Sequence, residues 1–168
     1  TSSLSPRLSF AQSDTDTKEA KALFDSGVDL YRTGKLEEAR VKFKAAYALK
    51  RRPSIALNLA NAELQTKRPL EALAHYREVL TMSDAKPEDK DDARTGINEA
   101  RKVVGSVTVT PATATITVDG EARTAIDGAV EVTPGPHTFV LRVGEVETTE
   151  KLTITAGQTV SLHAKEKA

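Results

Sequence analysis

The spacing of the apolar residues changes near Val103, and this change limits the possible folds more than any other feature of the chain. From 16 to 103, Ala, Leu, Lys, Glu and Arg dominate, and apolar residues recur with the 3.6-residue period of an α-helix. From 104 to 168, Val and Thr alternate with the period of two that is typical of half-buried strands. The sequence therefore predicts an α+β protein in two domains, with a helical array over 16–103 and a small antiparallel β-sandwich over 104–168.

About five helices are expected in the first domain. Asp16 is followed three positions later by Glu19, a capping box that predicts the first helix to begin at Asp16. Pro69 and Pro87 are expected in the first turns of the fourth and fifth helices, where a missing backbone N–H does no harm. The segment 1–15 is expected to be a disordered N-terminus.

The second and fourth helices carry the same motif. Ala39-x-x-x-Phe43-x-x-Ala46 aligns with Ala72-x-x-x-Tyr76-x-x-Val79 at a spacing of 33 residues, close to the ~34 residues of a tetratricopeptide repeat. The chain resembles that family most closely over 20–53 and less closely over 54–83. The matching small and large residues of the first pair are Leu23, Gly27, Tyr31, Gly34, Ala39, Phe43 and Ala46.

The second domain resembles the PEGA family of small β-domains. Three segments carry the resemblance: Pro111-Ala112-Thr113-Ala114, then Ile116-x-Val118-Asp119-Gly120, then Pro134-Gly135-Pro136-His137. Ala112 and Thr113 replace the Glu and Gly of the family's name. A generic immunoglobulin-like sandwich is the alternative.

Composition excludes several classes of function. The 24 basic and 24 acidic residues give a net charge of zero, so no overall field attracts nucleic acid or an anionic membrane. The absence of cysteine excludes disulfides and thiolate sites. No apolar run approaches the roughly 20 residues of a membrane-spanning helix, so no membrane span is expected in this chain.

We find no sequence motif for catalysis, a cofactor or a metal. His75, His137 and His163 are widely separated, so none is spaced to share a metal ion. His137 is expected to have a structural role in its turn, and His75 to be a solvated helix residue. There is no Gly-rich phosphate loop and no Gly-x-Ser-x-Gly elbow. We therefore expect no enzyme, no catalytic residues, no cofactor and no metal.

The resemblance to tetratricopeptide repeats suggests a binding surface. In such arrays the first helix of each pair lines a groove, and the corresponding residues here are Asp25, Asp29, Arg32, Asn58 and Asn61. Asn has poor helix propensity, which indicates a role for Asn58 and Asn61. That role is either partner binding or a hydrogen bond to an adjacent helix.

The start of the chain bears on the compartment. The chain begins with Thr1, and Ser9-Phe10-Ala11-Gln12 has the small-x-small pattern of a signal-peptidase site. This segment is either a signal-peptide remnant or an ordinary terminus. The PEGA resemblance also implies export, to the periplasm or cell surface.

Together these features predict a scaffold module of the bacterial cell envelope that binds a peptide or partner protein in the helical groove. One alternative is attachment to a cell-wall polymer or glycan through the β-domain, although that domain has few aromatics to stack on sugars. Another is the sensory part of an envelope signalling system.

Overall fold

The structure, a computed structural model, describes residues 7–167, and the side chains from Ser13 onward. The chain forms two compact units, Thr1–Ile97 and Asn98–Ala168, here called the helical unit and the β unit. The predicted order, helices followed by a small β domain, is confirmed. The change from helix to strand falls between Arg101 and Gly105, close to Val103.

The two units divide earlier than this change, because the last turn of the fifth helix bonds to the β unit. Arg101 Nε donates to Glu131 Oε1 at 3.2 Å. Val104 O accepts a hydrogen bond from the N–H of Gly157 at 2.8 Å. The final helical residues therefore belong with the strands.

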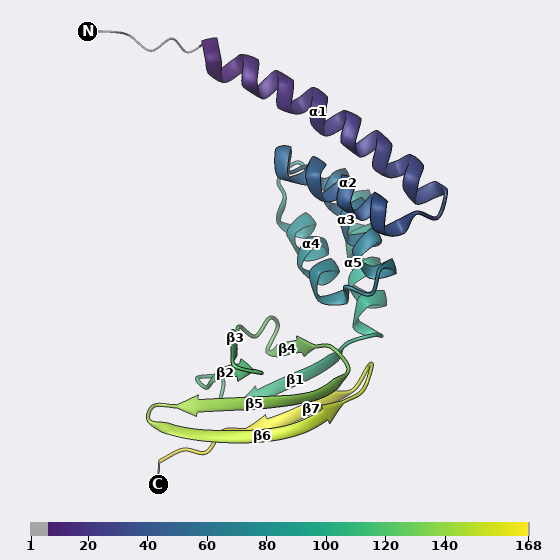
Figure 1. Cartoon of the computed structure of the whole chain (residues 1–168). Coiled ribbons are helices and arrows are strands. Elements are labelled where there is room, and N and C mark those ends of the chain that lie inside the picture. Colours follow the sequence, from purple (N-terminus) through teal and green to yellow (C-terminus); the bar gives the residue numbers. More distant parts are fainter. Residues whose placement is uncertain (1–6, 168) are drawn as a thin grey trace, which may run out of the picture. The chain divides into compact units, whose positions relative to one another are not determined.

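Five helices form the first part of the described chain (Figure 1). Three of them begin at a proline, as expected for Pro69 and Pro87 and also seen for Pro53. The helices are α1 (Arg7–Arg32), α2 (Leu36–Leu49), α3 (Pro53–Gln65), α4 (Pro69–Thr81) and α5 (Pro87–Arg101).

The predicted start of the first helix is wrong. The helix begins at Arg7, so Asp16 lies inside it and is no N-cap, and the segment 7–15 is helical. From Arg7 to Ser26 the sequence contains neither Gly nor Pro, so nothing forces the helix to begin at the capping box. Lys50 Nζ also donates to Ser13 Oγ at 3.2 Å, which ties this early turn to the end of α2. Residues 1–6 lie outside the described part of the chain.

Two aromatic rings, 33 residues apart, fill the core of the helical unit. Phe43 on α2 and Tyr76 on α4 are both almost completely buried. Each ring lies against a glycine of another helix: a Cβ on Gly27 would stand 2.6 Å from Phe43 Cε1, and one on Gly96 would collide with the Tyr76 ring. The close approach of these helices therefore requires a residue without a side chain at both positions.

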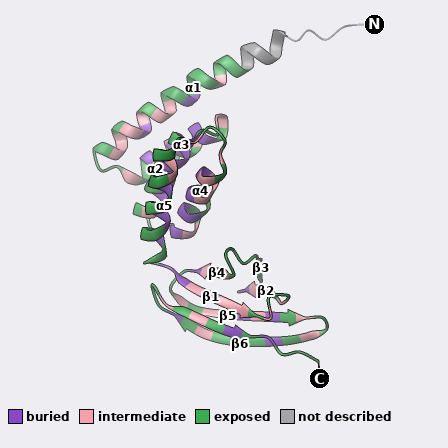
Figure 2. Cartoon of the chain, turned by 180° about the vertical axis from the view of Figure 1, so that it is seen from behind, coloured by how far each residue is buried: buried purple, intermediate pink, exposed green. Residues whose placement is uncertain are grey.

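Small residues complete this core. Along the helices, buried residues recur among exposed ones (Figure 2), as expected for helices that pack on one side and face solvent on the other. The fully buried alanines of this unit are Ala39, Ala46, Ala56, Ala60, Ala62, Ala72 and Ala93.

In the described part of the β unit, seven strands form two sheets that share one apolar core, which confirms the β-sandwich. The sheet orders are β4-β1-β7 and β3-β2-β5-β6. The strands are β1 (Gly105–Thr110), β2 (Thr115–Val118), β3 (Glu121–Arg123), β4 (Ala129–Val132), β5 (Gly135–Val143), β6 (Val146–Ile154) and β7 (Thr159–His163). The core residues are Val107, Ile116, Val118, Val130, Val132, Phe139, Leu141, Ile154, Leu162 and Ala164.

One strand pair departs from the antiparallel prediction. β1 and β7 are parallel, with Ser106 opposite Thr159 and Thr110 opposite His163. The connection 155–158 carries the chain from β6 in one sheet to β7 in the other, so β7 pairs with the first strand of the unit and not with its neighbour in sequence. Alternation along a strand indicates which face is buried but carries no information about the partner strand.

The turns have the conformations that their sequences predict. Asp119-Gly120 and Asp127-Gly128 have positive φ at both residues, 54° and 85° in the first and 53° and 79° in the second. Gly adopts this region at no steric cost, and Asp, like Asn, tolerates it better than most residues with a side chain. These two turns position the short strand β3 and the segment leading to β4.

Candidate functional site

The residues predicted to line a groove lie on the surface of the first and third helices. Asp25, Asp29 and Arg32 are exposed on α1, and Asp25 pairs with Lys21 at 2.6 Å on the same helix. Their spacing of four and three residues places them along one stripe of the helix. A patch that contains both negative and positive charge is therefore present on α1.

The two asparagines of α3 differ in what they contact. Asn58 is half-buried, and its Nδ2 donates to Ser54 O of its own helix at 2.8 Å. Asn61 is exposed, and its Oδ1 accepts a hydrogen bond from the hydroxyl of Tyr76 at 2.6 Å. Burial raises the pKa of Tyr76 to about 12, so this hydroxyl remains a donor. The structural alternative considered for the asparagines thus holds for Asn61, which joins α3 to α4. Among the described residues, no hydrogen bond or ion pair links these asparagines to the charged stripe of α1.

A buried ion pair, which the sequence did not reveal, lies between α3 and α4. Glu63 is only 3% exposed, and its Oε2 lies 2.7 Å from His75 Nδ1. The hydrogen bond to Glu63 raises the pKa of His75, against the opposing effect of burial. The prediction that His75 is a solvated helix residue is therefore wrong. The available signal was the position of Glu63, three residues after the buried Ala60 and so on the same helix face.

The second helix contributes an aromatic residue to this pair. The Tyr47 ring meets the His75 ring edge-on, with 5.3 Å between centroids. Arg51 lies over the Tyr47 ring at 5.5 Å and pairs with Glu78 at 3.3 Å. Burial raises the pKa of Tyr47, and the nearby carboxylate of Glu78 acts in the same direction. We call Tyr47, Glu63 and His75 the buried polar cluster; it connects α2, α3 and α4.

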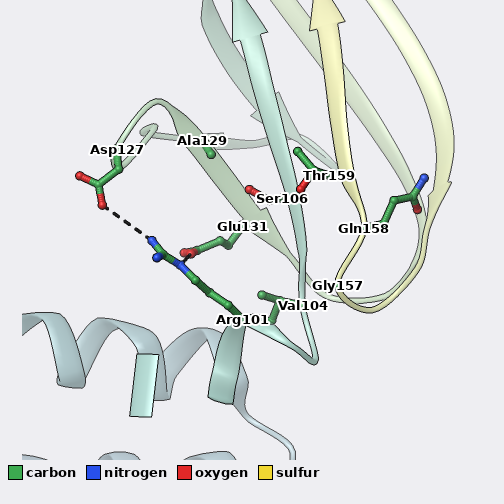
Figure 3. A pocket seen from close by; sticks show the side chains of 9 residues that line it. All are labelled: Arg101, Val104, Ser106, Asp127, Ala129, Glu131, Gly157, Gln158 and Thr159. Atoms are coloured by element: carbon green, nitrogen blue, oxygen red, sulfur yellow. Dashed lines mark hydrogen bonds and ion pairs between the residues drawn. The ribbon is translucent and has the colours of Figure 1, made fainter. Parts of the chain in front are cut away.

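In the β unit, a polar cleft of about 440 Å³ lies between the end of α5 and the sheet β4-β1-β7 (Figure 3). Arg101 enters it from α5 and reaches toward two carboxylates, with Nε 3.2 Å from Glu131 and NH2 3.7 Å from Asp127. The cleft is lined by Arg101, Val104, Ser106, Asp127, Ala129, Glu131, Gly157, Gln158 and Thr159.

The strand register explains why polar side chains meet in this cleft. Glu131, Ser106 and Thr159 are direct neighbours across β4, β1 and β7. They therefore form one row on the same face of the sheet. Gln158 is held by its own turn, because its Oε1 accepts from Thr155 N at 2.8 Å. The cleft thus presents hydroxyls, an amide, carboxylates and a guanidinium, which together suit a polar, hydroxyl-rich ligand.

Sequence reasoning did not identify this cleft, because its residues come from segments up to 58 positions apart, from Arg101 to Thr159. Within residues 7–167 there is no group of three or more His, Cys, Asp or Glu side chains that could hold a metal ion. Likewise, none of the described helices is long and apolar enough to span a membrane.

Comparisons of the chain with family models, with curated proteins and with solved structures find no match. The resemblances to tetratricopeptide repeats and to the PEGA family therefore rest on the residues named above.

Proposed function

We propose that this protein is a non-enzymatic interaction module of the bacterial cell envelope, whose helical unit binds a peptide or a partner protein. In this proposal the protein is exported to the periplasm or to the cell surface. The binding residues are the charged stripe of Asp25, Asp29 and Arg32 on α1 together with Asn58 on α3.

The recurrence of one buried aromatic position in the second helix of each pair carries this proposal. The aromatic rings of Phe43 and Tyr76, 33 residues apart, each occupy space left by a glycine on another helix. Stacked helix pairs of this kind bury their small residues and leave the outward face of the first helix of each pair for ligands. In the buried polar cluster, Glu63 and His75 bond to each other and join α3 to α4. This arrangement supports a binding role more than catalysis.

The structure sharpens the choice of residues for a test. Asn61 is a poor probe of binding, because its substitution also removes the hydrogen bond from Tyr76. Within the described residues, the side chains of Asp29 and Arg32 make no hydrogen bond or ion pair with another helix, and Asn58 bonds only within α3. Replacing these three residues is therefore expected to leave the fold intact.

The experiment is affinity capture from envelope extracts with the full chain and an Asp29→Lys/Arg32→Glu/Asn58→Ala variant. A matched control carries Glu38→Lys and Lys44→Glu, which swap charges at exposed positions of α2. Capture of a protein by the wild type and the control, but not by the stripe variant, is the expected result. Equal capture by all three proteins contradicts a site on α1 and α3, and turnover of any substrate class that a single substitution abolishes contradicts a non-enzymatic role.

The polar cleft favours a second candidate, binding of a cell-wall polysaccharide by the β unit. Its Ser106, Thr159, Gln158 and carboxylates are groups that pair with sugar hydroxyls. Purified sacculi as a parallel bait test this candidate. The candidate is supported if Ser106→Ala/Asp127→Asn weakens retention on sacculi while Thr149→Ala, at an exposed position of β6, does not. It is contradicted if neither variant changes retention.

A further inference from the structure

A histidine in the β unit is held between two hydrogen-bond acceptors. His137 lies near the start of β5, with its side chain only 12% exposed and its ring 6.0 Å from that of Phe139. Nδ1 lies 2.6 Å from Asp119 Oδ2, and Nε2 lies 2.7 Å from the backbone oxygen of Thr133. The expected structural role of His137 in its turn is thus confirmed.

Both ring nitrogens must carry a hydrogen to make these bonds. The carbonyl oxygen of Thr133 can only accept, so Nε2 is the donor of that bond. Asp119 is ionised near neutrality, because the N–H of Thr138 and the His137 ring hold the pKa of its carboxyl below the ordinary value. An ionised carboxylate also only accepts, so Nδ1 is a donor too. An imidazole with a hydrogen on each nitrogen is the cationic form.

The two hydrogen bonds of the His137 ring join segments that are separate in sequence. Asp119 belongs to the turn between β2 and β3, and Thr133 to the connection between β4 and β5. Asp119 also extends the pairing of β2 with β5, since its N–H donates to Thr138 O at 2.8 Å while its Oδ1 accepts from Thr138 N at 2.8 Å. The His137 ring therefore lies where two turns meet at one end of the sandwich.

The surrounding charges compete over the proton on this ring. Burial lowers the pKa of His137, and Arg123 on β3 acts in the same direction. The hydrogen bonds to Asp119 and Thr133 and the attraction of the Asp119 charge outweigh these effects and raise the pKa above its ordinary value of 6.5. On β6, Leu152 lies directly opposite His137 in the strand pairing. Lys151 and His137 both line a shallow surface pocket.

We propose that His137 is a pH-sensitive latch, which in its cationic form ties the β2–β3 turn to the β4–β5 connection and loses one of these two bonds when it gives up its proton. The contribution of the latch to stability is fully present below pH 6.5 and is lost as the pH rises through the pKa of the folded protein. At the acid end, the part that depends on Asp119 is lost as the pH falls through its lowered pKa. This device operates within the β unit and is independent of the function proposed for the helical unit.

The test is an NMR titration of the histidine rings of the full chain, which reads the protonation state of each nitrogen directly. His163, whose Nδ1 pairs with the Thr110 hydroxyl at 2.6 Å, serves as the internal comparison, and a His163→Gln variant assigns its signals. In the wild type, His137 is expected to keep both nitrogens protonated at pH 6.5 and to titrate at a higher pH. Amides of the β2–β3 turn or of the β4–β5 connection should exchange faster above that transition.

An Asp119→Asn variant separates the latch from simple packing. Asn tolerates the positive φ of this turn and can still accept a hydrogen bond from Thr138, but it lacks the charge that stabilises the cation. The pKa of His137 should fall in this variant, with little change at His163. A wild-type His137 that titrates at or below 6.5, or one whose titration is unchanged in Asp119→Asn, overturns the proposal.

Discussion

Each unit contains a histidine paired with a carboxylate, and the two pairs differ in how far the carboxylate is removed from water. In the helical unit the side chain of Glu63 is 4% exposed, whereas in the β unit that of Asp119 is 50% exposed. A buried charge that loses its partner is costly, while an exposed one is stabilised by solvent. The same pair of residue types therefore supports the core in one unit and adjusts a turn in the other.

The largest effect is expected from removing His75. A His75→Ala variant leaves the Glu63 charge buried and unpaired, which should lower the free energy of unfolding by about 3 kcal/mol. Urea unfolding followed by far-UV circular dichroism measures this change. If the pair acts as described, Glu63→Leu/His75→Phe should be clearly more stable than His75→Ala, and equal stability of the two variants contradicts a buried ion pair.

A smaller effect is expected where helices meet at a glycine. Gly27→Ala places a methyl group against the Phe43 ring, and such overpacking should cost about 1–3 kcal/mol. The β-unit control is Gly128→Ala, where φ is +79° and no atom lies within 4 Å of the added carbon, so only backbone strain of roughly 1 kcal/mol remains. Thermal unfolding of both variants measures the two losses of stability. A greater loss in Gly128→Ala than in Gly27→Ala contradicts the prediction.

The hydrogen bond between Tyr76 and Asn61 should have a weaker effect. Tyr76→Phe keeps the ring against Gly96 and removes only the hydroxyl, so we expect a loss of about 1 kcal/mol. Partner capture in the assay above should survive this substitution, since Asn61 then keeps its exposed side chain. If Tyr76→Phe loses partner capture but keeps its stability, Asn61 acts in binding and not only in joining α3 to α4.

The mildest change alters no side chain and raises only the pH. The pKa of His75 is raised by its hydrogen bond to Glu63, and Glu78 and Glu71 act in the same direction. Its stabilising contribution is present below its ordinary pKa of 6.5 and is lost as the pH rises through the raised value. Hydrogen exchange between pH 6 and 9, corrected for the intrinsic rate, should show α3 and α4 losing protection. A His75→Gln variant should lack this dependence, and an unchanged wild-type profile argues against it.

Local features of the fold were predictable because they depend on neighbours in sequence. The 3.6-residue and two-residue periods identified the helices and most strands, and Asp-Gly dipeptides located the turns at Asp119 and Asp127. The start of α1 was misplaced because a capping box permits a helix to begin but does not prevent one from extending further upstream.

The candidate sites were predicted less well. The polar residues of α1 and α3 could be named from their helix positions, but the Tyr76 bond that engages Asn61 crosses to another helix. His75 was misassigned because its partner is twelve residues away on a different helix. Arg101 and Glu131 are thirty residues apart, so no local sequence pattern predicts the polar cleft.

Periodicity and turn chemistry act over a few residues, so the two-part architecture, the buried face of each element and the positions of the turns follow from the amino-acid pattern alone. The partners of these elements depend on long-range packing: β1 with β7 in parallel, Glu63 with His75, and Arg101 with the carboxylates of the cleft. The physical reason is that a period selects the face of a helix or strand that leaves water, whereas packing and strand topology select what that face or its neighbours will meet.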